Sequence, residues 1–553
     1  MQKNIQLRVK PEEAANASHL VSILAQAIGQ KQEAISGYHV LKQSIDARSR
    51  QQVWINLTIL AFINEPPSNR FQDKIEFPTL PNNAKEVIII GAGPAGLFAA
   101  LECIQLGLRP IVLERGKDVR SRRRDLAKLN KEGIVNPESN YCFGEGGAGT
   151  YSDGKLYTRS NKRGSIDKIL RLFYQFGADE RILYEAHPHI GTNKLPHIIS
   201  EMREQIERSG GKVLFEKKLV DLVIINGEIK ETITSDGDRF PTEALLLATG
   251  HSARDIFLLL KQKGILIEAK PFALGVRVEH PQSNIDGIQY HCAVRGPNLP
   301  PAAYSLVEQV SDRGVFSFCM CPGGIIAPAA TAPGEIVVNG WSPSKRDNPY
   351  ANSGMVVQID LATAGDFLAK QGQNNRNLKS SINYADPLLL LDFQRYVENK
   401  AFEMGGGLQV APAARLVDFC TNKTSLNLPD ASYLPGLRTA DMSSILPAFV
   451  HHTLQEGFKA FGKKMKGYYT NDAIVVATES RTSSPVRIPR DADNFQHPQV
   501  KNLYPCGEGA GYAGGIVSAA MDGQKLAVAI ASNYNNYFFW LIFFFSLNFF
   551  RQQ

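Results

Sequence analysis

The sequence predicts an α/β protein with a Rossmann-like domain, a β-rich domain inserted into it and a small α+β domain at the N-terminus. Three observations predict this arrangement. A short apolar run at 85–90 leads into a glycine-rich turn and then an apolar helix pattern, as in a βαβ unit. Short strand patterns rich in Pro and Gly fill 270–360, and a separate strand–helix–strand pattern precedes a Pro-rich linker.

A glycine motif follows the apolar run KEVIII at 85–90. Gly91, Gly93 and Gly96 form a G-x-G-x-x-G sequence around Pro94 and Ala95, and a helix pattern follows. The first glycine permits a tight turn, the second lets the backbone approach a pyrophosphate, and the third lets the helix pack closely on the strand. The pyrophosphate is expected at the helix N-terminus, where unpaired N–H groups favour negative charge.

A second strand pattern at 110–113 ends at Glu114, 18 residues after Gly96. A carboxylate at this place accepts the hydroxyls of an adenosine ribose and repels a 2′-phosphate, which disfavours NADP. Arg115 follows it and is included in the predicted cofactor site. Strand, helix, second strand and acid together predict a dinucleotide site.

Two later segments favour FAD over NAD as the dinucleotide. Residues 502–508 form a strand pattern that ends at Gly507 and Glu508, before a helix pattern that opens near Gly514, Gly515 and Ile516. This resembles the second FAD segment of glutathione-reductase-type flavoproteins, in which the acid holds a ribityl hydroxyl and the helix N-terminus faces the flavin pyrimidine. That family usually has Asp where this chain has Glu508.

The segment ALLLATG at 244–250 resembles the ATG motif of the same fold, where a strand ends beside the cofactor. Its Thr249 and Gly250 are therefore predicted cofactor contacts. The three segments follow one another in the expected order, and the predicted cofactor is FAD.

Five longer segments resemble one family along most of the chain. They are SIDAR at 44–48, NYCFGEGGAGTYSDGKL at 140–156, SFCMCPGG at 317–324, ESRTSSPVRI at 479–488 and YPCGEGAGYAGG at 504–515. Together they resemble a family of bacterial and plastid proteins described as FAD-dependent dehydrogenases, from about residue 4 to about residue 530. The resemblance implies the cofactor FAD and leaves the substrate open.

A loop at 144–154 contains five glycines. Backbone N–H groups of such a loop can wrap phosphate or flavin, and the alternative is a glycine loop without a ligand. The predicted contacts here are Gly146, Gly147, Gly149, Thr150 and Ser152, with Lys155 beside them.

The basic run at 120–124 is typical of a solvated helix face. Within it, Arg122 matches the family pattern, and the resemblance assigns this arginine to FAD.

Cys319 and Cys321 form a Cys-x-Cys sequence in an apolar segment bounded by Gly and Pro. One interpretation is a redox pair beside the flavin, because thiolates donate electrons readily when their pKa is lowered. The other is two buried structural cysteines, which are commoner than redox pairs.

Glu479 and Arg481 precede the second FAD segment. Arg481 could fix a substrate carboxylate through two hydrogen bonds or stabilise reduced flavin. A structural ion pair is the alternative. Glu479, Arg481, Cys319 and Cys321 are the candidate catalytic residues.

These patterns divide the chain into six segments. We expect a small α+β domain at 1–65, a linker at 66–83, the first part of the FAD-binding domain at 84–265, a β-rich substrate domain at 266–440, the second part of the FAD-binding domain at 441–533 and an atypical apolar tail at 534–553. The apolar run at 537–550 would span about 21 Å as a helix, less than the roughly 30 Å hydrocarbon core, so a membrane role is disfavoured.

Composition limits the compartment and the partners. The net charge of +7 is a mild excess that an anionic cofactor explains as readily as nucleic acid. Seven scattered cysteines without a CxxC pair or zinc spacing indicate a reducing compartment, no disulfide framework and no metal site. The N-terminus has no continuous apolar segment, so we expect a cytoplasmic protein, or one of the plastid stroma in a photosynthetic eukaryote.

The predicted function is an FAD-dependent oxidoreductase, a dehydrogenase or reductase that transfers hydride between flavin N5 and a small molecule. No second G-x-G-x-x-G follows a strand, so NAD(P)H would serve only as a transient donor. Two alternatives stay open: an FAD-dependent RNA-modifying enzyme and a non-catalytic flavin-binding protein. The modest charge, and the lack of an RNA-reading aromatic motif, disfavour a nucleic-acid partner.

Overall fold

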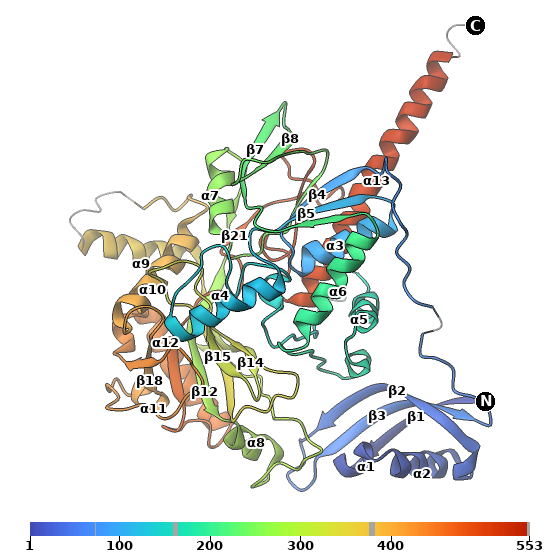
Figure 1. The fold of residues 1–553 in the computed structure, drawn as a ribbon. Helices are drawn as coiled ribbons and strands as arrows, with labels where there is room; N and C mark the ends of the chain where they lie inside the picture. The colour runs from blue at the N-terminus through green and yellow to red at the C-terminus, as the bar shows by residue number, and fades with distance from the viewer. Residues whose placement is uncertain (72, 159–163, 375–381, 550–553) are drawn as a thin grey trace.

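The computed structural model describes every residue except 72, 159–163, 375–381 and 550–553, and it leaves undescribed the side chains of 373–374 and 535–549. Figure 1 shows a small N-terminal sheet with two helices, a parallel-sheet domain, and a β-rich domain below that domain. The predicted α/β class, with a Rossmann-like domain joined to a β-rich one, is confirmed.

The N-terminal domain is a three-stranded antiparallel sheet in the order β1–β3–β2. In its central strand, buried residues alternate with half-buried ones, as expected when one face of a sheet packs on helices. Asn16 separates the two helices because its side chain accepts the backbone N–H of His19 at 3.1 Å and caps the second one. The elements are β1 (Gln2–Val9), α1 (Pro11–Ala15), α2 (Ala17–Ile28), β2 (Ile35–Asp46) and β3 (Trp54–Ile63).

The second domain is built on a five-stranded parallel sheet in the order β22–β10–β4–β5–β6. Its strands are short apolar runs buried on both faces, as parallel sheets require. The strands are β4 (Glu86–Ile90), β5 (Arg109–Leu113), β6 (Lys212–Leu214), β10 (Leu245–Leu247) and β22 (Leu503–Pro505).

Helices cover both faces of this sheet. One face packs against α3, α5, α6 and α13, and the other against α7 and a small antiparallel sheet of β7, β8 and β9. The bounds are α3 (Pro94–Gln105), α4 (Val119–Glu132), α5 (Ile166–Gln175), α6 (Leu195–Arg208), α7 (Arg254–Gln262), α13 (Ile516–Phe549), β7 (Leu219–Ile225), β8 (Glu228–Thr234) and β9 (Arg239–Pro241).

The β-rich domain is a seven-stranded sheet in the order β13–β14–β17–β12–β20–β18–β19. Its strands are β12 (Phe272–Pro281), β13 (Val307–Val310), β14 (Arg313–Cys321), β17 (Tyr350–Ile359), β18 (Ala411–Arg415), β19 (Leu437–Thr439) and β20 (Ile474–Glu479). Its helices are α8 (Gln282–Tyr290), α9 (Leu361–Asn374), α10 (Leu389–Met404), α11 (Leu416–Cys420) and α12 (Ala448–Lys464). Two small ladders complete the fold: β15 (Ile325–Pro328) with β16 (Val338–Trp341), and β11 (Glu268–Ala269) with β21 (Val486–Arg487).

The boundary expected at residue 440 is wrong. β20 is buried along its whole length and pairs with β12 on one side and β18 on the other. A strand with no exposed edge needs a partner on each side, so it belongs inside the β-rich sheet. The segment 441–479 is therefore part of the β-rich domain, and the chain returns to the parallel sheet only at β22.

Helix α13 carries the apolar tail. It runs on from the parallel-sheet domain to Phe549, and Figure 1 shows its end directed away from the body of the protein. The side chains from residue 535 on lie outside the description, so the expectation that the tail has no membrane role stays a prediction. Among the helices of the described part of the chain, none has the length and apolar content needed to cross a membrane.

The close packing of α3 on β4 gives a test. A Cβ added at Gly96 would lie 1.9 Å from the carbonyl oxygen of Gly91, a backbone atom that cannot move aside without shifting the turn. We expect Gly96→Ala to lower the free energy of unfolding by about 3 kcal/mol, measured by urea denaturation. Gly296→Ala is the control, because a Cβ there meets no atom within 4 Å. Equal midpoints for the two variants would contradict the packing described.

Candidate functional site

A cleft lies at the carboxyl ends of the parallel strands. It contains about 1340 Å³ of atom-free space that opens to solvent. The chain leaves β4 toward β5 on one side and returns in β10 on the other, and ligands of such sheets bind where the strand order reverses in this way. The cleft is lined by fifteen of the predicted cofactor residues: Gly91, Gly93, Pro94, Ala95, Glu114, Arg115, Gly147, Gly149, Ser152, Thr249, Gly250, Gly507, Glu508, Gly515 and Ile516.

Two helix N-termini face this cleft. α3 begins at Pro94 and α13 at Ile516, and both residues line it. The helices can approach closely because Gly523 of α13 packs against Ala95, where a Cβ would lie 2.0 Å from the carbonyl oxygen. Unpaired N–H groups and the positive end of each helix dipole therefore meet at one place, which suits an anionic ligand with two charged or polar ends.

The wall of the cleft is largely bare backbone. A Cβ at Gly250 or Gly515 would meet no atom within 4 Å, and one at Gly93 would meet only Gly147, at 3.9 Å. Side chains at these positions would occupy the cleft itself. The residues present therefore fit a large cofactor that lies against the backbone, as a dinucleotide does.

Glu114 links the loops around the cleft. Its carboxylate, 4% exposed, accepts backbone N–H groups from Ala92 at 2.8 Å and from Gly116 and Gly144 at 2.9 Å. Three such hydrogen bonds fix the glycine turn relative to the 144–154 loop. Glu114 thus shapes the site as well as lining it.

Arg122 has a different role from the predicted contact with FAD. Its guanidinium is fully buried, does not line the cleft, and donates at 2.8 to 3.0 Å to four backbone carbonyls. Those acceptors are Asn140, Tyr141, Glu145 and Gly147. Because its donors are used by the loop, Arg122 supports the loop's shape, and the expected contact with the cofactor is corrected.

Four other predicted cofactor residues also do not line the cleft. The Thr150 hydroxyl donates to the carbonyl of Glu145 at 2.8 Å, and Gly146 packs against Thr150. Gly96 lies against the Gly91 turn, which is the close helix–strand packing expected of it. Gly514 donates its N–H to the Ser518 hydroxyl at 3.0 Å, in the turn that precedes α13.

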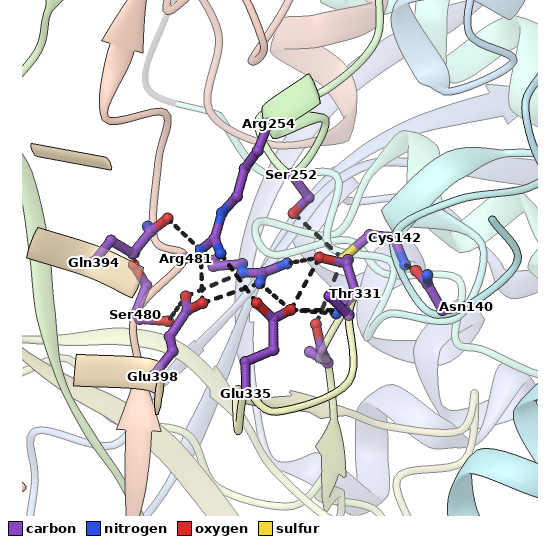
Figure 2. Close-up of polar contacts among 12 residues, drawn as sticks. Asn140, Cys142, Ser252, Arg254, Thr331, Glu335, Gln394, Glu398, Ser480 and Arg481 are labelled. Atoms are coloured by element: carbon purple, nitrogen blue, oxygen red, sulfur yellow. Dashed lines mark hydrogen bonds and ion pairs between the residues drawn. The ribbon is translucent and has the colours of Figure 1, made fainter. Parts of the chain in front are cut away.

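Arg481 belongs to a buried network of four charges (Figure 2). It donates to Glu335 at 2.6 Å, to Glu398 at 3.1 Å and to the Thr331 hydroxyl at 2.7 Å. Arg254, from α7, donates to the same two glutamates at 3.0 and 2.6 Å. The donors of Arg481 are thus used by the protein, and the substrate-anchoring role is corrected in favour of the structural ion pair.

The network joins the two large domains. Arg254 begins α7 of the parallel-sheet domain, whereas Glu398 lies on α10 of the β-rich domain. Burial alone would raise the pKa of Glu335, but the charges of Arg481 and Arg254 lower it to about 2. Glu335 is therefore ionised at neutral pH.

Glu479 is also a structural partner, away from the cleft lining. It forms a buried ion pair with Arg277, which donates to the Asn352 side chain at 2.7 Å and to the backbone carbonyl of Cys319 at 2.7 Å. Although burial opposes its charge, Glu479 raises the pKa of Arg277. Glu479 therefore acts on the site through Arg277, as a positioning residue.

Cys319 reaches the cleft, and Cys321 lies buried behind it. The register of β14 against β17 shifts between Phe318 and Cys321. Cys319 adopts a left-handed backbone, with φ of 45°, at this bulge. The Cys321 Sγ lies 3.3 Å from the backbone carbonyl oxygen of Cys319.

His251 lines the cleft and was not among the predicted site residues. Its Nε2 lies 3.5 Å from Glu508 Oε2, and its buried Nδ1 has no hydrogen-bond partner among the residues that the structure describes. Burial lowers its pKa, so the imidazole is neutral. Its position directly after the ATG motif is the signal that could have identified it.

The described residues offer no cluster of three or more His, Cys, Asp or Glu side chains that could hold a metal ion.

Three family descriptions match separate parts of the chain. Residues 1–62 match a domain of unknown function, residues 86–127 an "FAD binding domain", and residues 271–482 an "FAD-dependent protein, C-terminal domain-like". The last range ends close to β20, in agreement with the extent of the β-rich sheet.

Two relatives were found by sequence. An "Uncharacterized protein" of Clostridium beijerinckii is 38% identical over 529 residues, which are 93% of this chain and 95% of that protein. The tRNA uridine 5-carboxymethylaminomethyl modification enzyme MnmG of Finegoldia magna is 26% identical over 183 residues, which are 32% of this chain and 26% of that enzyme.

Solved structures are more distant. CtdE in complex with FAD is 10% identical, with a TM-score of 0.32, over 81% of this chain and 84% of that one. The 2,6-dihydroxypyridine-3-hydroxylase of Arthrobacter nicotinovorans is 10% identical, with a TM-score of 0.34, over the same shares of the two chains. At these scores neither structure carries an argument about the chemistry of this chain.

The charge network predicts a loss of stability when Arg481 is replaced. In Arg481→Met, Glu335 and Glu398 share one arginine, and uncompensated charge stays buried. We expect the free energy of unfolding to fall by about 3–5 kcal/mol, measured by urea denaturation. Arg120→Met is the control, because Arg120 is exposed on α4. A fall no larger than that of the control would contradict the structural role.

The same network predicts a pH dependence. The pKa of Glu335 is about 2 in the folded protein, below the value of about 4.3 expected when unfolded. Its contribution to stability is therefore present above pH of about 4.3 and is lost as pH falls toward about 2. The difference in free energy of unfolding between the wild type and Glu335→Gln should shrink by about 3 kcal/mol over this interval. A constant difference would show that Glu335 does not titrate as described.

Proposed function

The chain belongs to a family of FAD-dependent proteins, together with its Clostridium beijerinckii relative, and on that premise we propose that it is a flavin-dependent oxidoreductase acting on a small molecule. The reaction proposed is hydride transfer between flavin N5 and the substrate. One observation carries the proposal: bare backbone and two helix N-termini form one side of the cleft, and reactive side chains from both large domains reach the other.

The residues present divide between the two ends of FAD. The N-terminus of α3 would hold the pyrophosphate, and Glu114 lies where the adenosine ribose is bound in this fold. The N-terminus of α13, at Ile516, would face the flavin pyrimidine. Bound flavin supplies two-electron chemistry, and a positive helix end beside its pyrimidine favours the reduced form.

The substrate is proposed to bind between the flavin and the β-rich domain. Lys155 and Cys319 line the cleft on that side, and His251 lies beside Glu508. Lys155 offers a cation for an anionic or polar substrate group, and the neutral imidazole of His251 can accept or donate a proton. NAD(P)H is proposed only as a transient electron donor.

A second candidate is modification of RNA, which the match to MnmG favours. That match covers about a quarter of the enzyme and the net charge here is small, so the small-molecule reaction is preferred. A gel-shift experiment with tRNA at low salt separates the two. Binding that weakens steeply with added salt would favour the RNA-modifying enzyme.

The proposal is tested by visible absorbance of the purified protein after reconstitution with FAD. A flavin spectrum that bleaches anaerobically with NADH or NADPH would indicate a reductase, whereas an unreactive flavin would direct the search to substrates that donate electrons themselves. Failure to take up FAD would overturn the proposal.

The cleft geometry gives a matched pair of variants. A Cβ in Gly93→Ala enters the open space that the pyrophosphate is proposed to fill, while Gly296→Ala adds the same atom away from the cleft. We expect Gly93→Ala to weaken FAD binding at least about tenfold, or about 1.4 kcal/mol, by titration of flavin fluorescence. Equal affinity in both variants, with the far-ultraviolet circular dichroism unchanged, would place FAD elsewhere.

A further inference from the structure

Two cysteines of the β-rich domain meet the cofactor cleft at the bulge in β14. Cys319 lines the cleft, whereas Cys321 is fully buried. We propose that Cys319 and Cys321 form a redox-active dithiol, with Cys319 as the attacking thiolate, and that the substrate class is a low-molecular-weight disulfide. The inference rests on the proposed function, because it names the substrate class of the same cleft.

The backbone brings the thiols together. A regular strand would direct residues 319 and 321 to the same face of the sheet but about two residues apart, whereas the register shift and the φ of 45° at Cys319 fold the chain back at this point. The Cys321 Sγ lies 3.3 Å from the Cys319 carbonyl oxygen, within donor distance. The Cys321 thiol therefore lies against the Cys319 backbone.

Two cations surround the pair. The Nζ of Lys155, which lines the cleft, lies 3.9 Å from Cys319 Sγ. Arg277 Nη2 lies 3.7 Å from Cys321 Sγ and donates to the Cys319 carbonyl at 2.7 Å. The ion pair with Glu479 fixes this guanidinium on its buried side. Positive charge on both sides favours a thiolate over a thiol.

A hydrogen bond from Cys321 and the charges of Lys155 and Arg277 lower the pKa of the Cys319 thiol, although burial and the negative charge of Asp153 oppose them. The same hydrogen bond, together with burial, raises the pKa of Cys321. The two thiols are thereby differentiated: the one at the cleft is the thiolate, and the one behind it keeps its proton.

This division suits thiol–disulfide exchange. The Cys319 thiolate attacks one sulfur of a disulfide R–S–S–R, a bond forms between Cys319 and that sulfur, and the other half leaves as RS⁻. Cys321 then loses its proton to that leaving thiolate and attacks Cys319 Sγ. The second RS⁻ leaves as the bond between Cys319 and Cys321 forms. The substrate disulfide gains two electrons, and the dithiol loses two.

Cys142 and Cys506 also line the cleft. Cys142 is half-buried, and its sulfur accepts a hydrogen bond from the Ser252 hydroxyl at 3.4 Å. Cys103, Cys420 and Cys506 are buried, and burial raises the pKa of each thiol. Cys292 is half-buried and lies outside the cleft lining, so Cys292→Ser serves as a control that leaves the proposed pair intact.

The test uses reduced holoprotein, without oxygen, and the chromogenic probe 5,5′-dithiobis(2-nitrobenzoate). We expect a fast phase that releases two nitrothiolates per chain, because Cys321 displaces the second. Cys321→Ser should release one and stay as a mixed disulfide, which intact-protein mass spectrometry detects. Cys321→Ala repeats the measurement should serine disturb the buried site. Cys319→Ser should lack the fast phase, and Cys292→Ser should keep it.

Lys155→Met tests whether the charge of Lys155 stabilises the Cys319 thiolate. Loss of the cation should raise the pKa of Cys319 and slow the fast phase about tenfold at a pH near 6, with little change at high pH where the thiolate forms anyway. A uniform slowing at every pH would indicate a merely structural role for Lys155 and would contradict its effect on the thiolate.

Other outcomes decide between the proposals. A fast phase that persists in Cys319→Ser, or one nitrothiolate per chain in the wild type, would overturn the dithiol. If the protein keeps its flavin spectrum but has no fast phase, the dithiol fails and the flavin enzyme stands. If the fast phase is present but FAD does not bind, the proposed function fails and the dithiol stands.

Discussion

The arrangement of the two large domains depends on the buried network of Arg254, Arg481, Glu335 and Glu398. Burying four charges is costly unless each is paired and hydrogen bonded, and here each arginine contacts both glutamates. Such a network tolerates little change in geometry, because displacing one side chain leaves an unpaired charge on the others. It therefore fixes the β-rich sheet relative to the parallel sheet, and with it the width of the cleft between Cys319 and the glycine turns.

Around this network, Arg122, which the sequence assigned to FAD, and Glu479, which it offered as catalytic, lie outside the cleft lining and act through other residues. Arg122 supports the glycine loop, Glu479 fixes Arg277, and Arg277 in turn binds the backbone of Cys319. Polar side chains buried in a low-dielectric interior must be fully hydrogen bonded, which makes them abundant near a cofactor cleft without bringing them into contact with the ligand. The side chains that do line the cleft include the reactive groups of Lys155, Cys319 and His251.

Whether a feature could be predicted from the sequence depends on whether its contacts are local in the chain. The turn at Gly91–Gly96 and the acid at Glu114 depend on contacts within one βαβ unit, so their spacing alone predicted where they lie. The pairing of β20 with β12, and the ion pairs of Arg481, join segments far apart in the chain, and no local pattern encodes them. The bulge at Cys319 depends on the register against β17, which the local sequence does not reveal.

The order of strands in the parallel sheet has a consequence for biosynthesis. β4, β5, β6 and β10 come from the first half of the chain, whereas β22 and the N-terminus of α13 come from its end. During translation, an early folding unit would contain the glycine turn and the ribose acid but would lack one edge strand and the second helix end. The entire β-rich domain must emerge and fold before these last pieces arrive. A nascent chain therefore presents an unfinished nucleotide pocket for about half of its synthesis, and cofactor capture becomes a late event in the folding of the protein.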